Sequence, residues 1–170
     1  MADDSINTPE ERPQEKSQEQ VFLVVVDESE EMSQALFYAS RCAIRTEGRV
    51  GLLMVVEPAE FQHWANVAEL MREERREEAE DLLQTIGTAV QQRTGKMPVI
   101  HIREGNVEEE LIKLIDEDQS ISSLVLGAAT GDFGPGPLVS ALVNKVSGKL
   151  RVPITVVPGS LTQAEILAIT

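Results

Sequence analysis

Residues 21–26 read Val-Phe-Leu-Val-Val-Val and are followed directly by Asp27. Six consecutive apolar residues, four of them valine, have the length and the β-branched composition of a strand. Because apolar and polar residues do not alternate in this run, we expect both faces of the strand to be buried, as in a parallel sheet.

The alternation of a buried strand with an amphipathic helix repeats along the chain. Further strands are predicted at 50–56, 98–102, 121–126 and 154–157. Helices are predicted from Met32, over 59–92, after Asn106 and over 138–150, with a short helix or packed tail from Thr162. Since parallel strands need crossover connections, the predicted fold is an α/β open sandwich, doubly wound around a five-stranded parallel sheet.

Local signals place the helix ends and the buried helix faces. Ser29 is the expected N-cap of the first helix, and Gly48 lies just past its end. Asn106 and Glu109 have the spacing of a capping box for the third helix. The second helical region is expected to bury one face in its second half, made of Ala79, Leu82, Leu83, Ile86 and Val90.

Composition limits the function classes that remain open. Acidic residues outnumber basic ones 29 to 15, which gives a formal net charge of -14 and argues against partners such as nucleic acid or an anionic membrane surface. No apolar run reaches the roughly 18 residues of a membrane span, and the first residues lack the pattern of a secretory signal. The single cysteine, Cys42, fits a reducing compartment. A cytoplasmic location is therefore predicted.

The chain divides into three parts by composition. Residues 1–19 are rich in Glu, Gln, Asp, Ser and Pro, and we expect a disordered acidic tail that acts as a solubilising or an interaction segment. Residues 20–159 form the predicted domain, and residues 160–170 form a C-terminal extension.

Ligands of doubly wound folds bind at the carboxyl ends of the strands, where two features stand out. Asp27 follows the first strand, and its carboxylate either accepts hydrogen bonds from a ribose or caps the next helix. The glycine-rich segment 126–140 joins a strand to a helix and is either a phosphate cradle or only a loop. It lacks both the Walker ending and the dinucleotide spacing.

Several segments, in their order and spacing, resemble the universal stress protein family over about 21–158. They are Val24-Val-Val-Asp-Glu-Ser29, Leu52-Leu-Met-Val-Val-Glu57, Glu104-Gly-Asn106 through Ile112, Ser123-Leu-Val-Leu-Gly127, Lys145-Val146 and Val152-Pro-Ile-Thr-Val-Val157. The resemblance implies a Rossmann-like fold of the adenine nucleotide alpha hydrolase type, and homodimers formed through the last strand. It also implies two classes, one that binds ATP and one that does not.

The ATP-binding class carries the motif Gly-x2-Gly-x9-Gly-Ser/Thr, and this chain departs from it. Gly127 matches, whereas the next three motif positions fall on Thr130, Ser140 and Ala141, with Gly131 one place late. The resemblance places the base and ribose near Val25, Asp27 and Val55. It therefore implies a pocket for ATP or for a shorter nucleotide such as AMP, with magnesium only alongside ATP, or no nucleotide at all.

Three functions follow from these readings. The first is a dimeric regulatory or signalling module with an adenine-nucleotide pocket, and the second is a nucleotide-independent scaffold for an unknown protein partner. The third, a slow ATPase, is the weakest because 127–140 contains no Lys or Arg, so we expect no enzyme. If the pocket binds nucleotide, Asp27→Ala and Gly127→Val are expected to abolish affinity and to leave the fold intact.

Other candidates are expected to be structural. His63 and His101 lack partners at metal-ligand spacing, so no metal site is predicted. Cys42 is expected in the core, and the charged run 72–78 on a solvated helix face. The apolar stripe Phe61, Trp64, Ala68 and Met71 is expected to pack in the core, to cover the pocket as a lid, or to form a surface that docks a partner.

Overall fold

The computed structural model describes residues 18–58, 65–146 and 148–170. Its centre is a parallel sheet in the order β3-β2-β1-β4-β5. The strands are β1 (Val21–Val25), β2 (Arg49–Val56), β3 (Val99–Glu104), β4 (Ile121–Ala128) and β5 (Ile154–Pro158). The helices are α1 (Met32–Arg45), α2 (Ala65–Thr94), α3 (Val107–Glu117), α4 (Pro137–Ala141) and α5 (Gln163–Ile169), and α4 continues as a π-helical turn, η1 (Leu142–Val146).

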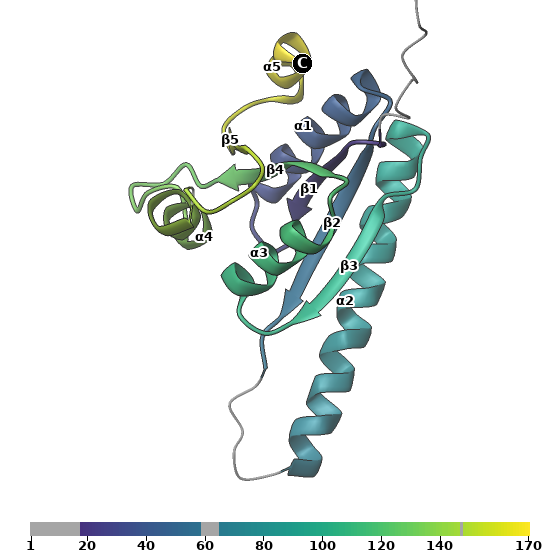
Figure 1. Ribbon diagram of the computed structural model, residues 1–170, viewed down its shortest axis with the longest axis vertical. Coiled ribbons are helices and arrows are strands. Elements are labelled where there is room, and N and C mark those ends of the chain that lie inside the picture. Colours follow the sequence, from purple (N-terminus) through teal and green to yellow (C-terminus); the bar gives the residue numbers. More distant parts are fainter. Residues whose placement is uncertain (1–17, 59–64, 147) are drawn as a thin grey trace, which may run out of the picture.

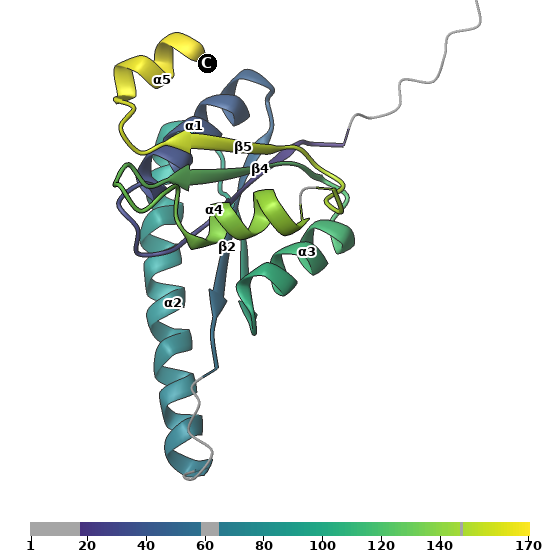
Figure 2. The same ribbon diagram turned by 90° about the vertical axis from the view of Figure 1, so that its left-hand side faces the viewer.

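Helices cover both faces of the sheet, which confirms the predicted doubly wound α/β architecture (Figures 1 and 2). Leu23 of β1 packs in a core with α3 and α4, whereas its neighbour Val24 packs in a second core with α1, α2 and α5. Both side chains are fully buried. The unbroken apolar run in β1 thus reflects a strand that has a helical layer on each side.

The start of α1 differs from the prediction. The N-cap is Glu31 rather than Ser29, and its side chain makes no capping bond. Ser29 instead donates two hydrogen bonds to Asp27 Oδ1, from its amide at 3.0 Å and its hydroxyl at 2.5 Å. Asp27 therefore fixes the turn between β1 and α1 and does not cap the helix itself. At the other end Gly48 donates to the carbonyl of Ala43, as expected just past a helix.

Helix α2 is partly buried and partly solvated. Ala79, Leu83 and Val90 are buried as predicted, but Leu82 is 36% exposed and does not belong to the buried face. The N-terminal turns of α2 project beyond the sheet (Figure 1). Of the apolar stripe that was expected over 61–71, Phe61 and Trp64 lie outside the described residues. Ala68 and Met71 are described, and both are half-buried.

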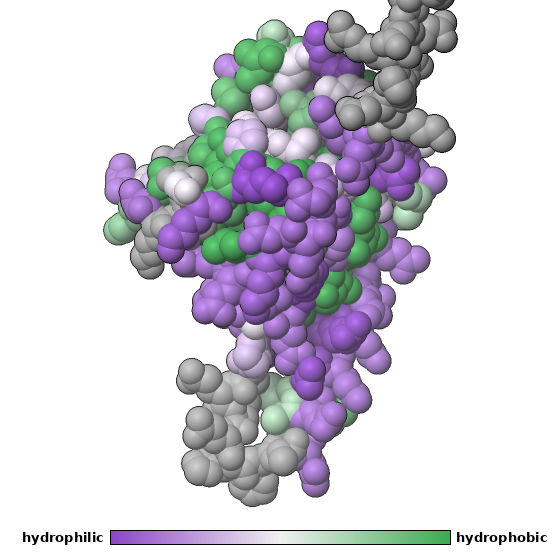
Figure 3. All heavy atoms as spheres, viewed as in Figure 1, coloured by the Kyte–Doolittle hydropathy of each residue, from purple (hydrophilic) through white to green (hydrophobic). Residues whose placement is uncertain are grey.

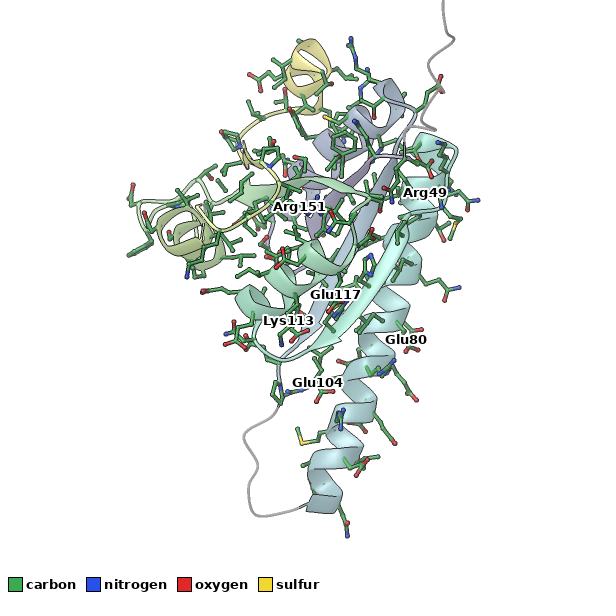
Figure 4. All side chains as sticks on the ribbon, in the orientation of Figure 1. Arg49, Glu80, Glu104, Lys113, Glu117 and Arg151 are labelled. Carbon is green, nitrogen blue, oxygen red and sulfur yellow. The ribbon has the colours of Figure 1, made fainter. Side chains whose placement is uncertain are left out.

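Ion pairs connect α2 and the chain start to the sheet. Arg76 pairs with Glu80 along α2, as expected for a solvated face, but Arg72 reaches Glu104 at the end of β3, with its Nε and Nη2 both 2.7 Å from Oε2 (Figure 4). Glu19, in the expected tail, contacts Arg49 and Lys96. The bond from Lys96 lowers the pKa of Glu19. The rest of that tail, residues 1–17, lies outside the described residues.

The side of the sheet next to α3 is tied by polar groups. Asn106 caps α3 as predicted, because its Oδ1 accepts from the amide of Glu109. Arg151 lies behind α3 and donates to the carbonyls of Ile115, Asp118 and Ile121, which closes the connection from α3 to β4 (Figure 4). The surface of this side is mostly hydrophilic, in keeping with the high acidic content of the chain (Figure 3).

The two helical segments after β4 agree to different degrees with the sequence-based expectation. The helix predicted over 138–150 is shorter, since α4 and η1 together end at Val146. The C-terminal extension forms α5, with a complete capping box between Thr162 and Glu165. Ile166 is fully buried in the core beside α1, and Arg41 and Arg45 bond to Thr170. None of the helices in the described part of the chain is long and apolar enough to cross a membrane.

Candidate functional site

The strand order creates a cleft at the carboxyl edge of the sheet. From β1 the chain runs outward through β2 to β3, then crosses back to β4 on the other side of β1. Helices α1 and α4, which follow these two adjacent strands, therefore lie on opposite faces (Figure 2). Ligands of open α/β sheets bind at such a reversal of strand order.

Two adjoining cavities occupy this position, of about 250 and 480 Å³. Both are lined by Val25, Asp27, Glu28, Pro137 and Leu138. The smaller extends toward α1 and Gly127, and the larger toward the ends of β2 and the start of α3. We call the two together the switch-point cleft. Its size suits a nucleoside-sized ligand.

The cleft has an apolar wall and a polar rim. Val25 is 8% exposed, and Met54, Val55, Val107 and Leu138 are partly buried around it. Such side chains can pack against a planar heterocycle. Asp27 and Asn106 stand at the rim, and both bonds that Ser29 donates to Asp27 use Oδ1, which leaves Oδ2 available to a ligand hydroxyl. Of the two roles expected from the sequence, the helix cap is replaced by the turn with Ser29, and this turn is compatible with a ribose contact through Oδ2.

Gly127 lines the cleft, but packing within the protein already requires glycine at this position. A Cβ at this position would overlap the backbone carbonyl of Glu31 at the start of α1. Gly159 is similar, since a Cβ there would lie 2.8 Å from Cβ of Glu31. The expectation that Gly127→Val leaves the fold intact is therefore wrong, because the two glycines are what allow α1 to begin against β4.

The remaining candidates of the glycine-rich segment lie apart from the cleft. Thr130 and Gly131 are exposed in the loop after β4, and neither lines the two cavities. The amide of Ala129 donates to the carbonyl of Pro135 and closes this loop. Ser140 and Ala141 are half-buried in α4 and also do not line the cleft. The structure thus brings together Val25, Asp27, Val55 and Gly127 and leaves the other four outside.

Several residues of the cleft are missing from the sequence-based list. They include Glu28, Glu31, Met54, Glu57, Asn106, Val107, Glu108, Pro137 and Leu138. The rule that ligands bind after the strands pointed to the ends of β2 and β3, and Asn106 was recognised as a cap. Asn106 lines the same cavity as Val25 of β1 because the chain turns back toward β1 after β3. No local pattern in the sequence indicates the direction of that turn.

Histidine and cysteine chemistry lies elsewhere. His101 on β3 faces Asp118 at 4.0 Å, and burial lowers its pKa despite that carboxylate. For Cys42, partial burial of the thiol raises its pKa. Cys42 is only partly buried, so the expected core position is wrong. Within the described ranges no three or more His, Cys, Asp or Glu side chains gather as metal ligands, and His63 falls outside those ranges.

The fold and the cleft define a doubly wound α/β protein with a cleft at the switch point of its sheet. The sequence model of the Universal stress protein family matches residues 20–158, and the chain belongs to that family. The sequences of curated proteins include no significant match to it.

Solved structures agree on the fold. The universal stress protein UspA from Lactobacillus plantarum is 19% identical, with a TM-score of 0.69 over 83% of this chain and 99% of its own. A universal stress protein in complex with cAMP is 14% identical, with a TM-score of 0.57 over 85% and 100%. The universal stress protein from Archaeoglobus fulgidus in complex with dAMP is 17% identical, with a TM-score of 0.54 over 81% and 96%. Likenesses at this level of identity show a common fold alone.

Proposed function

We propose that this chain is a regulatory binding module that takes an adenine-nucleotide type of ligand in the switch-point cleft. The base packs on the apolar wall around Val25 and Val55, and Asp27 accepts a ribose hydroxyl through Oδ2. The observation that carries the proposal is the cleft itself, which lies at the reversal of strand order with one carboxylate at its rim. Two relatives of the same fold have been solved with cAMP and with dAMP, which supports the choice of ligand.

Asp27→Ala is expected to weaken the binding of adenosine and AMP about tenfold or more, because a hydrogen bond to a carboxylate contributes roughly 1.5–3 kcal/mol. Calorimetric titration of the purified chain measures this effect. Asp27→Asn is the more conservative variant, since its amide oxygen can keep the turn with Ser29. Asp116→Asn, on the exposed side of α3, is the matched control and should bind as the wild type does.

Equal affinities of the wild type and of a folded Asp27→Ala variant would contradict the ribose contact. If the wild type binds neither ligand, the nucleotide pocket is wrong. The second function, a nucleotide-independent scaffold for a protein partner, would then be favoured. That alternative has support in the structure, because Gly127 is explained by packing against Glu31 and four of the eight expected site residues do not line the cleft.

We also propose a homodimer that forms through β5. This strand is at the end of the sheet order, and its Val156 is 38% exposed. An edge strand with exposed apolar residues is a template for pairing with a second copy. Light scattering at micromolar concentration should give twice the mass of the 18.7 kDa chain. The mass of one chain would contradict the dimer.

A regulatory role in the cytoplasm, without catalysis, completes the proposal. Phosphoryl transfer needs cations around the phosphates. The described side chains that line the cleft include no Lys or Arg. The cleft thus supports binding better than turnover, and the partner that senses its occupancy is a protein.

A further inference from the structure

The charged side chains among the described residues that line the switch-point cleft are all acidic. Five carboxylate side chains belong to its lining: Asp27, Glu28, Glu31, Glu57 and Glu108. No Lys, Arg or His is among the described residues that line either cavity. The whole chain carries a formal charge of -14, so the surroundings add to this negative potential.

Two prolines reduce the number of backbone donors that the rim near α4 can offer to a phosphate. Pro135 and Pro137 have no N–H to donate. The amides of Ala129 and Ser140 already donate, to the carbonyls of Pro135 and Gly136. Helix α4 itself has only five residues before it changes to a π-helical turn. The segment that resembles a phosphate loop therefore offers fewer backbone donors than a loop without these two prolines would.

The arginines next to the cleft are engaged elsewhere. Arg72 and Arg75 line a separate cavity of about 250 Å³, which meets the cleft at Glu57. Arg72 makes its two 2.7 Å contacts with Glu104, and Nη1 of Arg75 donates to the carbonyl of Glu57 at 3.1 Å. Both guanidinium groups thus stabilise the contact between α2 and the ends of β2 and β3.

We propose that the switch-point cleft selects an uncharged ribonucleoside, of which adenosine is the example, and discriminates against the same compound with phosphate attached. This inference rests on the proposed function and specifies its ligand class. The apolar wall takes the base, and the carboxylates accept hydrogen bonds from ribose hydroxyls. A phosphate group carries about -1.5 to -2 charge at neutral pH, and the charged side chains that it meets in the lining of the cleft are carboxylates. In partly solvated surroundings, repulsion between the phosphate and one carboxylate weakens binding by roughly 2- to 30-fold.

Calorimetric titration with adenosine, cAMP and AMP tests this selection at low ionic strength, about 0.05 M. We expect affinity to fall in that order, with AMP at least about tenfold weaker than adenosine. Added salt should narrow the difference, because it screens repulsion between partly exposed charges. The adenosine affinity should change little with salt.

A charge-neutralising variant separates electrostatics from shape. Glu28→Gln together with Glu31→Gln keeps the size of both side chains, and we expect it to raise the affinity for AMP relative to adenosine about fivefold. Glu77→Gln combined with Glu73→Gln is the matched control, since it removes the same charge from exposed positions of α2 outside the cleft. Its AMP-to-adenosine ratio should equal that of the wild type.

The outcomes distinguish a failure of the phosphate selection from a failure of the proposed function. AMP binding as tightly as adenosine, or more tightly, would overturn the selection and leave the proposed function standing. An AMP-to-adenosine ratio that the glutamine variants do not change would also overturn it, because the carboxylates would not be its cause. If none of the three ligands binds, the proposed function fails and the selection fails with it.

Discussion

Gly127→Ala is expected to lower the free energy of unfolding by about 3 kcal/mol, the upper part of the range for overpacking in a closely packed site. The added methyl would overlap the backbone carbonyl of Glu31 and lie 2.6 Å from its carbonyl carbon and 3.0 Å from its Cγ. A flexible side chain could turn away, but backbone at the start of α1 cannot move without shifting the helix from β4. Urea unfolding followed by circular dichroism measures the loss.

Gly131→Ala provides the matched control, because it makes the same change four residues further along in the exposed loop. A Cβ at Gly131 meets nothing within 4 Å. We expect its free energy of unfolding to stay within about 0.5 kcal/mol of the wild type, as for other exposed positions. If Gly127→Ala is as stable as Gly131→Ala, then α1 does not begin against Gly127, and a ligand again becomes the better explanation of this glycine.

Ile166→Ala is expected to destabilise the protein by roughly 2–4 kcal/mol, as for other large-to-small changes at buried isoleucine. Ile166 is the fully buried residue of α5 and packs in the same core as Ala39 and Ala43 of α1. The family match ends at residue 158, so this core contact lies outside the matched region.

Leu167→Ala is the control for Ile166→Ala. Leu167 is the next residue on the same short helix and is 47% exposed, so its truncation should cost less than about 0.5 kcal/mol. Thermal unfolding of the three proteins should therefore separate Ile166→Ala alone from the wild type. Equal melting temperatures would show that α5 does not stabilise the domain, and that it is free to serve another surface.

The class of fold follows from the sequence because it depends on local patterns. Unbroken apolar runs such as 21–26 can be buried only when helices cover both faces of a sheet, and the intervening stripes supply those helices. The cap Asn106 was equally legible, and the structure shows its bond. Thr162 was expected only to start a short helix or packed tail, and the structure shows that it caps α5. Ser29 is not the cap because α1 starts at Met32, three residues after it, and Ser29 belongs to the preceding turn, where it donates to Asp27.

The site depended on tertiary structure. The strand-end rule pointed to Asp27, and the family resemblance pointed to Val25 and Val55; all three line the cleft. Sequence reasoning assigned Gly127 to a ligand, whereas the crossing of α1 over β4 gives this glycine a packing role. The carboxylates Glu57 and Glu108 come from distant segments and meet at the cleft only after the chain has crossed from β2 to α3. Periodicity fixes which face of an element is buried, but the sign of the charge around a cleft is decided where separate elements converge.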